Sequence, residues 1–246
     1  MGLTIGLGSA AGGKGKMLID IGFDVKASPV NNTLTEIPLV DTSYINNASS
    51  MFSGCSGVKV FPKINTSRVE RMNYMYQYCS LAESFPELDM TCVTDAGYMY
   101  NYCSGMKENP PINCPNLLRG NGMFSSCTGL LRVSQLNVKF SDCTEICAYC
   151  TNLHTIELID VSNCTSNLHL GNGSTKLVTC NVVGLKTNII FTSNSALSKE
   201  SVLFLFENAQ KVSSSKRISL HANTFNQLTA DEIAIATQKG FSVISA

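Results

Sequence analysis

The chain has 246 residues, of which 44% are hydrophobic and 15% are charged, and its 18 basic residues balance its 18 acidic residues. A net charge of zero argues against a nucleic-acid-binding surface, which requires clustered positive charge. No stretch approaches the roughly 20 apolar residues that cross a bilayer, so we predict no membrane insertion.

Residues 1–32 are predicted to form a Gly-rich arm and a capping strand. Apolar residues occupy every second position from Met17 to Val25, which indicates a strand with one buried face. The start of the chain lacks the basic and apolar regions of a secretory signal, so we expect no signal processing. The arm is expected to anchor the protein to other subunits through these residues: Gly2, Leu3, Ile5, Leu7, Gly12, Lys14 and Lys16.

The arm also contains a near match to a phosphate-binding loop between Gly8 and Lys14. That loop requires a Ser or Thr after the lysine to bind magnesium, and Gly15 has no hydroxyl group. We therefore predict no nucleotide and no other cofactor.

Residues 33–196 contain a repeat with a period of 24 residues. The pentapeptides MFSGC, MYQYC, MYNYC and MFSSC begin at Met51, Met75, Met99 and Met123. Three more sets of residues keep the same step: Pro38, Pro62, Pro86 and Pro110; Asp41, Asn65, Asp89 and Asn113; and Val58, Ala82, Met106 and Leu130. One residue is lost after Leu130, and the pattern then continues. Such a period predicts an α/β solenoid of stacked units.

Each unit is predicted to hold a short helix and a short strand. Thr66 or Ser67 is expected to begin the helix, and a strand is expected at residues 82–85, before Pro86. Apolar residues recur at helical spacing at Val69, Met72, Met75 and Cys79. We expect the strands to form a parallel sheet, with the helices on its other face.

Residues 197–246 are predicted to form an α/β cap. Ser198 precedes an amphipathic run that suits a helix, and residues 217–221 suit a strand. Thr229 and Glu232 have the spacing of a capping box before a second helix. A final strand at residues 241–244 would close the stack and cover the last apolar face.

The segment IPLVDTSYINNASSMFSGCSGV, residues 37–58, resembles the repeat of BspA-like leucine-rich-repeat proteins. The resemblance covers residues 33–177 and implies a leucine-rich-repeat-like solenoid. The segment LTADEIAIATQKGF, residues 228–241, resembles the closing segment of repeat proteins from phage tails and cell surfaces.

Eleven cysteines are present, an odd number that argues against a disulfide framework. Five share one repeat position and are predicted to be reduced and buried: Cys55, Cys79, Cys103, Cys127 and Cys150. The spacing of Cys143, Cys147, Cys150 and His154 offers an alternative, a metal or enzymatic site. No nucleophile with a neighbouring base stands out, so we expect no enzyme.

Tyrosines supply the candidate binding surface. Tyr78, Tyr102 and Tyr149 share one repeat position, and Tyr74 and Tyr98 share another, so stacking would align them. Aligned aromatic side chains bind proteins and glycans well. The alternative is that these tyrosines only cover the helix layer. Tyr76 and Tyr100 match Phe52 and Phe124 and are predicted to be core.

The leading hypothesis is a non-enzymatic structural and adhesion protein of a phage virion, such as a fibre, decoration or tail-associated subunit. It would be made in the host cytoplasm, form a homo-oligomer, join other virion subunits through its arm, and bind a host-surface protein or glycan. The first alternative is a bacterial cell-surface adhesin of the BspA-like type. The second is a metal-binding or enzymatic protein that uses the cluster from Cys143 to His154.

Overall fold

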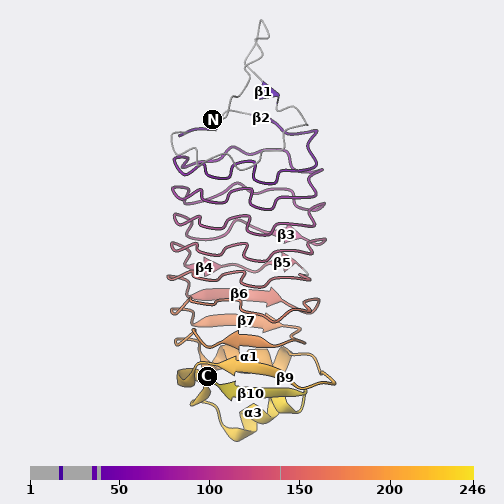
Figure 1. Ribbon diagram of the computed structural model, residues 1–246, viewed down its shortest axis with the longest axis vertical. Helices are drawn as coiled ribbons and strands as arrows, with labels where there is room; N and C mark the ends of the chain where they lie inside the picture. The colour runs from indigo at the N-terminus through magenta and orange to yellow at the C-terminus, as the bar shows by residue number, and fades with distance from the viewer. Residues whose placement is uncertain (1–16, 19–34, 38–39, 139) are drawn as a thin grey trace, which may run out of the picture.

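A computed structural model describes residues 17–18, 35–37, 40–138 and 140–246. In these parts the chain has a mixed α/β structure with small parallel sheets, few helices and no closed barrel. Successive repeats lie one above another along the long axis, with the C-terminal helices at one end (Figure 1). The strands are β1 (Met17–Leu18), β2 (Val40–Asp41), β3 (Asn113–Cys114), β4 (Arg132–Val133), β5 (Asn137–Val138), β6 (Thr155–Asp160), β7 (Thr179–Val183), β8 (Ile189–Phe191), β9 (Lys216–Leu220) and β10 (Phe241–Ser245). The helices are α1 (Lys199–Asn208), α2 (Ala222–Phe225) and α3 (Ala230–Thr237).

Main-chain hydrogen bonds join each repeat to the next. The amide groups of Tyr74 and Tyr76 donate to the carbonyl groups of Gly97 and Met99, over 3.0 and 2.8 Å. The same alternate-residue pattern recurs from residue 48 to residue 149, and it continues across the one-residue deletion after Leu130. Each repeat therefore satisfies buried polar groups of its neighbour, which no isolated repeat could do.

The short helix predicted in each repeat is wrong, and so is the helix layer behind the sheet. The described part of residues 33–196 contains no helix. Residues 72–79 instead form consecutive tight turns, with left-handed backbone at Tyr74 (φ 61°) and Tyr78 (φ 63°). Thr66, expected as a helix cap, is buried, and its hydroxyl group has no hydrogen-bond partner. The helical spacing of apolar residues arises because turns of three or four residues also return side chains to one side.

The predicted strand exists only in the later repeats. Residues 82–85 contain no strand, whereas the equivalent positions further along the chain lie in β4, β6 and β7. Pro86 supplies no amide proton for a ladder, and its counterparts in the later repeats are Ser134 and Glu157. The prolines of the first repeats thus explain why strand pairing at this position shrinks to an isolated bridge, as between Glu108 and Arg132.

The core runs through the stack, as the repeat pattern predicts. The apolar column of Val58, Ala82, Met106 and Leu130 is fully buried. Three of the four repeat methionines are fully buried, and Met51, in the first of these repeats, is partly buried against the same core.

Aromatic rings form a continuous stack within this core. The ring centroids of Tyr76 and Tyr100 are 5.5 Å apart, and those of Tyr100 and Phe124 are 5.7 Å apart, with nearly parallel planes. Phe52 continues the stack at 5.4 Å from Tyr76. The prediction that these four residues are core is confirmed.

The polar column closes the turn of each repeat. The side chains of Asp41, Asn65 and Asp89 each accept a hydrogen bond from the amide group two residues later. The hydrogen bonds from Thr91 lower the pKa of the Asp89 carboxyl group. The aspartate and asparagine residues therefore support local turns, for which short polar side chains are well suited.

The C-terminal elements match their predictions closely. Ser198 caps α1 by accepting the amide group of Ser201, and Thr229 and Glu232 form the predicted capping box of α3. β9 and β10 extend the parallel pairing of β8, the last strand before the cap. None of the three helices in the described ranges is long and apolar enough to span a membrane.

At the other end, β1 pairs in parallel with β2 and places Met17 opposite Val40. Of the strand predicted from Met17 to Val25, only residues 17–18 fall within the described residues. The predicted anchor residues Gly2, Leu3, Ile5, Leu7, Gly12, Lys14 and Lys16 lie outside them, and so does the near match to a phosphate-binding loop.

Candidate binding surface

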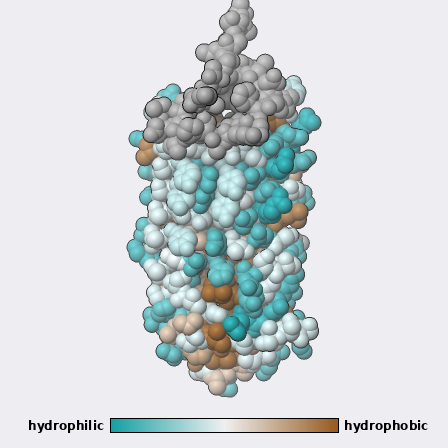
Figure 2. All heavy atoms as spheres, in the orientation of Figure 1, coloured by the Kyte–Doolittle hydropathy of each residue, from teal (hydrophilic) through white to brown (hydrophobic). Residues whose placement is uncertain are grey.

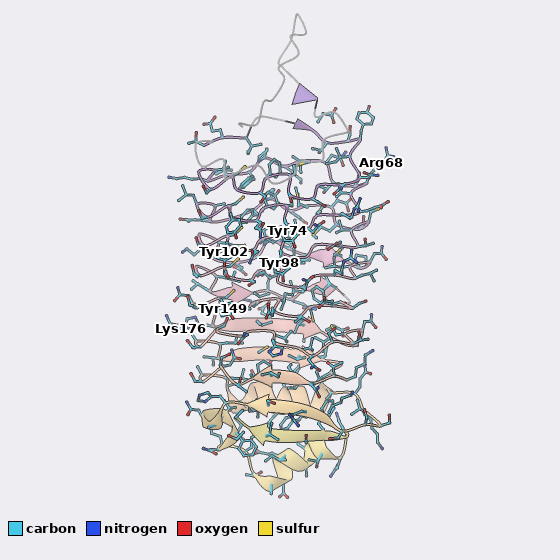
Figure 3. All side chains as sticks on the ribbon, viewed as in Figure 1. Arg68, Tyr74, Tyr98, Tyr102, Tyr149 and Lys176 are labelled. Carbon is cyan, nitrogen blue, oxygen red and sulfur yellow. The ribbon has the colours of Figure 1, made fainter. Side chains whose placement is uncertain are left out.

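The candidate tyrosines lie in two rows on the surface (Figure 3). The rings of Tyr74 and Tyr98 stack with centroids 5.4 Å apart and planes within 1° of parallel. Tyr78 and Tyr102 stack at 4.8 Å with an angle of 18°, and Tyr149 continues their row two repeats further on. Except for Tyr98, which is half-buried, these side chains are exposed, up to 53% at Tyr149. Because no helix lies beneath them in the described repeats, they do not cover a helix layer.

We refer to the two sets of equivalent positions by their first tyrosines. The Tyr74 row consists of Ser50, Tyr74, Tyr98, Gly122 and Glu145. The Tyr78 row consists of Gly54, Tyr78, Tyr102, Ser126, Tyr149 and Gly173.

Every residue of both rows has a left-handed backbone, with φ between 56° and 79°. This conformation costs a side-chain-bearing residue roughly 1–2 kcal/mol, and glycine avoids that cost. In the Tyr78 row, Gly54 and Gly173 avoid this conformational cost, whereas Tyr78, Tyr102 and Tyr149 do not. Tyrosine is therefore present at these positions in spite of a backbone cost, which favours a role for the side chain.

The rings also lie against the following repeat. A Cβ atom at Gly173 would be 2.6 Å from the ring of Tyr149, and one at Gly122 would collide with the ring of Tyr98. A tyrosine in either row thus needs another flat ring or a small residue at the next level.

A row of hydroxyl groups runs beside the Tyr78 row. Two residues beyond each of its first five positions, the chain has a Ser or Thr, and these side chains are half-buried or exposed. Together with Tyr78, Tyr102, Ser126 and Tyr149 of the Tyr78 row, these hydroxyl side chains line a groove with a volume of about 460 Å³. We call these side chains the hydroxyl row: Ser56, Ser80, Ser104, Thr128 and Thr151.

Sequence reasoning missed the hydroxyl row and the left-handed backbone. The hydroxyl row could have been found, because all five positions keep the repeat step and all carry Ser or Thr. Left-handed tyrosines leave no comparable sign, since tyrosine is not a residue that prefers this conformation.

The groove is uncharged. No residue that lines it is acidic or basic. Basic and acidic residues alternate at another repeat position, in the order Arg71, Asp95, Arg119 and Asp142. Arg119 donates a hydrogen bond to Asp95 at 2.8 Å, which raises the pKa of Arg119. Figure 2 shows that the visible face is hydrophilic or intermediate over most of its described area. The surface offers neutral hydrogen-bonding groups and aromatic rings rather than a net charge.

The cysteine column forms a ladder inside the stack. The thiol groups of Cys79, Cys103 and Cys127 donate to carbonyl oxygens of the preceding repeat, at 3.0–3.1 Å. Cys150 makes the same contact with Phe124. All eleven cysteines of the chain lie within the described ranges, all are free thiols, and ten are buried.

This arrangement predicts that a single thiol reacts in the native protein. Burial raises the pKa of Cys55, Cys114, Cys150 and Cys180 to about 12, which disfavours the reactive thiolate. Only Cys92 is exposed among the cysteines. At pH 8 a chromogenic disulfide reagent should therefore react with about one thiol group per chain in the folded protein, and with about eleven after denaturation.

The variant Cys92→Ser is the control for this measurement, and it should remove the fast equivalent. Several fast-reacting thiols in the native wild-type protein would contradict the buried ladder.

The structure does not assemble the alternative site predicted from Cys143 to His154. Cys143, Cys147 and Cys150 are buried in the core, whereas His154 is exposed and its Nδ1 atom lies 2.7 Å from the carbonyl oxygen of Asn152. No three His, Cys, Asp or Glu side chains in the described ranges are placed to hold a metal ion. Their close spacing in sequence reflects successive positions in a repeat.

Comparison with protein-family models gives a match over the first repeats. Residues 25–138 match a protein-family model. The family is described as Mycoplasma protein of unknown function, DUF285. It is related to BspA-like repeat proteins. No curated protein and no solved structure matches the chain. The DUF285 match ends within β5, whereas the interlocking of repeats by hydrogen bonds continues beyond it.

Proposed function

We propose that this protein is a non-enzymatic adhesion protein: a leucine-rich-repeat-like solenoid of the BspA-like type that binds a protein or glycan through its tyrosine and hydroxyl rows. The observation that carries the proposal is the placement of exposed tyrosines at left-handed backbone positions. Aromatic side chains offer a large contact area with little conformational entropy to lose, which suits them to recognition.

The solenoid supplies a rigid, extended support for these side chains. The repeated main-chain bonds fix each repeat on the next, and the thiol ladder and the aromatic stack do so within the core. In a stacked array each new repeat adds one more row position at a constant spacing. Such a surface matches a ligand that is itself extended or repeated.

The setting of this adhesive role remains a prediction from the sequence. In the phage-virion hypothesis, the attachment to other virion subunits is assigned to residues 1–16, which lie outside the described residues. A bacterial cell-surface adhesin would use the same rows. The proposed binding role is therefore independent of the choice between the two settings.

The experiment compares the wild-type protein with the triple variant Tyr78→Ser, Tyr102→Ser and Tyr149→Ser. Serine already occupies this row at Ser126, so the substitution is compatible with the backbone. Protein displayed on fluorescent beads is applied to an array of immobilised glycans and surface-protein peptides, and multivalent display makes weak contacts measurable. We expect bead retention on at least one probe to fall tenfold or more in the triple variant.

The matched control is Tyr44→Ser, which removes a tyrosine that is 63% exposed but does not line the groove. This variant should be retained as well as the wild type. Equal retention of the wild-type protein and the triple variant, or no retention of the wild-type protein by any probe, would overturn the proposal.

A further inference from the structure

The Tyr78 row has one level without a ring. Tyr78 and Tyr102 stack directly, but the next position is Ser126, and the position after it is Tyr149. The backbone at these four positions is equivalent: φ is 59–63° throughout, and each amide group donates to the carbonyl group at the same place in the following repeat. Ser126 therefore leaves empty the place that a fourth stacked tyrosine would fill.

The size of this gap follows from the spacing of the repeats. Hydrogen-bonded parallel chains lie about 4.8 Å apart, so two levels separate the rings of Tyr102 and Tyr149 by about 9.6 Å. A six-membered ring placed midway would lie about 4.8 Å from each tyrosine, a distance at which ring systems pack favourably. The tyrosines of the same row, Tyr78 and Tyr102, are themselves 4.8 Å apart. The rings of Tyr98 and Tyr149 lean in the same direction, each toward the following repeat, so a shared lean leaves the spacing of two levels unchanged.

The side chains around the gap indicate the kind of ring. Thr128 is two residues beyond Ser126 and so lies at the level of the gap, and Ser104 and Thr151 lie at the levels on either side; all three line the same groove. A purely aromatic guest would leave these hydroxyl groups without partners. A pyranose ring has C–H groups on its faces, which can pack on the tyrosines, and hydroxyl groups on its rim, which can exchange hydrogen bonds with the hydroxyl row.

The absence of charged residues in the groove also indicates which class of sugar it would bind. No acidic or basic residue lines the groove, so nothing there would compensate a carboxylate, sulfate or phosphate group. A sugar ring placed between the side chains of Tyr102 and Tyr149 would enter edge first, so only its outer edge could continue into a longer chain. This geometry suits the terminal residue of an oligosaccharide.

We infer that the space between Tyr102 and Tyr149, above Ser126, binds the terminal pyranose ring of a neutral glycan. This inference rests on the proposed adhesive function and assigns its ligand class and its central contact. The affinity of a single site for one sugar ring is expected to be weak, because the contact is small and the ligand loses freedom on binding.

The test fills the gap with the protein's own side chain. In Ser126→Tyr, the new ring has the same backbone conformation as Tyr102 and can stack between Tyr102 and Tyr149. The matched variant Ser126→Gly leaves the gap open and suits the left-handed backbone. Binding of neutral oligosaccharides with different terminal hexoses is followed by saturation-transfer NMR and by the bead array.

We expect Ser126→Tyr to bind at least tenfold more weakly than the wild type and than Ser126→Gly, while it unfolds no more easily than the wild type. Tyr44→Ser, which lies outside the groove, should bind like the wild type. Unchanged glycan binding by Ser126→Tyr would overturn the inference, although adhesion through the rows would survive if the triple tyrosine variant still failed to bind. A preference for acidic glycans, or for phenol and indole over hexose, would also overturn it. The proposed function itself fails if the wild type binds no probe, or if the triple tyrosine variant is retained as well as the wild type.

Discussion

Raising the pH from 9 to 11 is expected to unfold this protein over a narrow range. Ten cysteines are buried, and burial holds the pKa of several of them far above the value of 9.0 that an unperturbed thiol has. The pKa is raised to about 12 at Cys55, Cys114, Cys150 and Cys180. It is also raised well above its usual value at Cys103, Cys127 and Cys147.

The direction of the effect follows from where the protons are held. Below pH 9 both the folded and the unfolded chain keep these thiols protonated, so stability does not depend on them. Above pH 9 the unfolded chain releases the protons and the folded chain retains them, so the free energy of unfolding falls as the pH rises. Each such thiol removes up to about 1.4 kcal/mol per pH unit, so four thiols together remove up to about 5.6 kcal/mol per pH unit.

That loss is comparable with the whole stability of an ordinary domain, about 5–15 kcal/mol. The buried phenols of Tyr76 and Tyr100, whose pKa values are also raised by burial, act in the same direction at still higher pH. The measurement is the free energy of unfolding from urea titrations between pH 7 and pH 11, followed by circular dichroism.

Two variants serve as controls for this pH dependence. Cys92→Ser changes the exposed thiol and should leave the slope unchanged, whereas Cys180→Ala should lower the slope by about one proton. A free energy of unfolding that stays constant between pH 8 and pH 11 would contradict the burial of the thiol column.

The sequence allows the levels of the stack to be predicted, because the packing of one repeat on the next restricts the same positions in every copy. The apolar column, the stacked core aromatics and the methionines were all identified in this way, and all are buried except Met51, which is partly buried against the same core. The cap was also predictable, because Ser198, Thr229 and Glu232 act locally through the chemistry of helix capping. The starts of α1 and α3 therefore depend little on the rest of the fold.

The path of the chain within one repeat was less accessible. Spacings of three and four residues are shared by a helix and by consecutive tight turns, so Val69, Met72 and Met75 could not distinguish them. The deciding interaction is the bond between amide and carbonyl groups of successive repeats, which is a property of the assembled stack. A single repeat considered alone contains no information on it.

The same distinction applies to the candidate site. The alignment of Tyr78, Tyr102 and Tyr149 follows from their shared repeat position, and their exposure does not. Exposure depends on left-handed turns that direct alternate side chains out of the stack. The gap at Ser126 also cannot be recognised from the sequence, because it exists only once the rings of the neighbouring repeats are placed on either side of this serine.

Replacing Tyr100 with alanine is expected to cause the largest loss of stability from a single substitution in the aromatic core. Tyr100 is 1% exposed and stacks on Tyr76 at 5.5 Å and on Phe124 at 5.7 Å, so it joins three successive repeats. Truncation removes these contacts and leaves a cavity, and such changes cost about 3–5 kcal/mol. The repeats before residue 100 should unfold at a lower urea concentration than the cap, because each repeat is stabilised only by its neighbours.

Tyr102→Ala provides a matched control two residues away in the same repeat. Tyr102 is 47% exposed, and within the described residues its ring stacks only on Tyr78, so its loss should change the free energy of unfolding by no more than about 1 kcal/mol. Urea unfolding of both variants at pH 7, followed by circular dichroism and by hydrogen exchange of the cap amides, measures the difference. Similar losses of stability in the two variants would contradict the placement of Tyr100 in the core and of Tyr102 on the surface. The expected contrast instead assigns one tyrosine to holding the stack together and leaves the other free for binding.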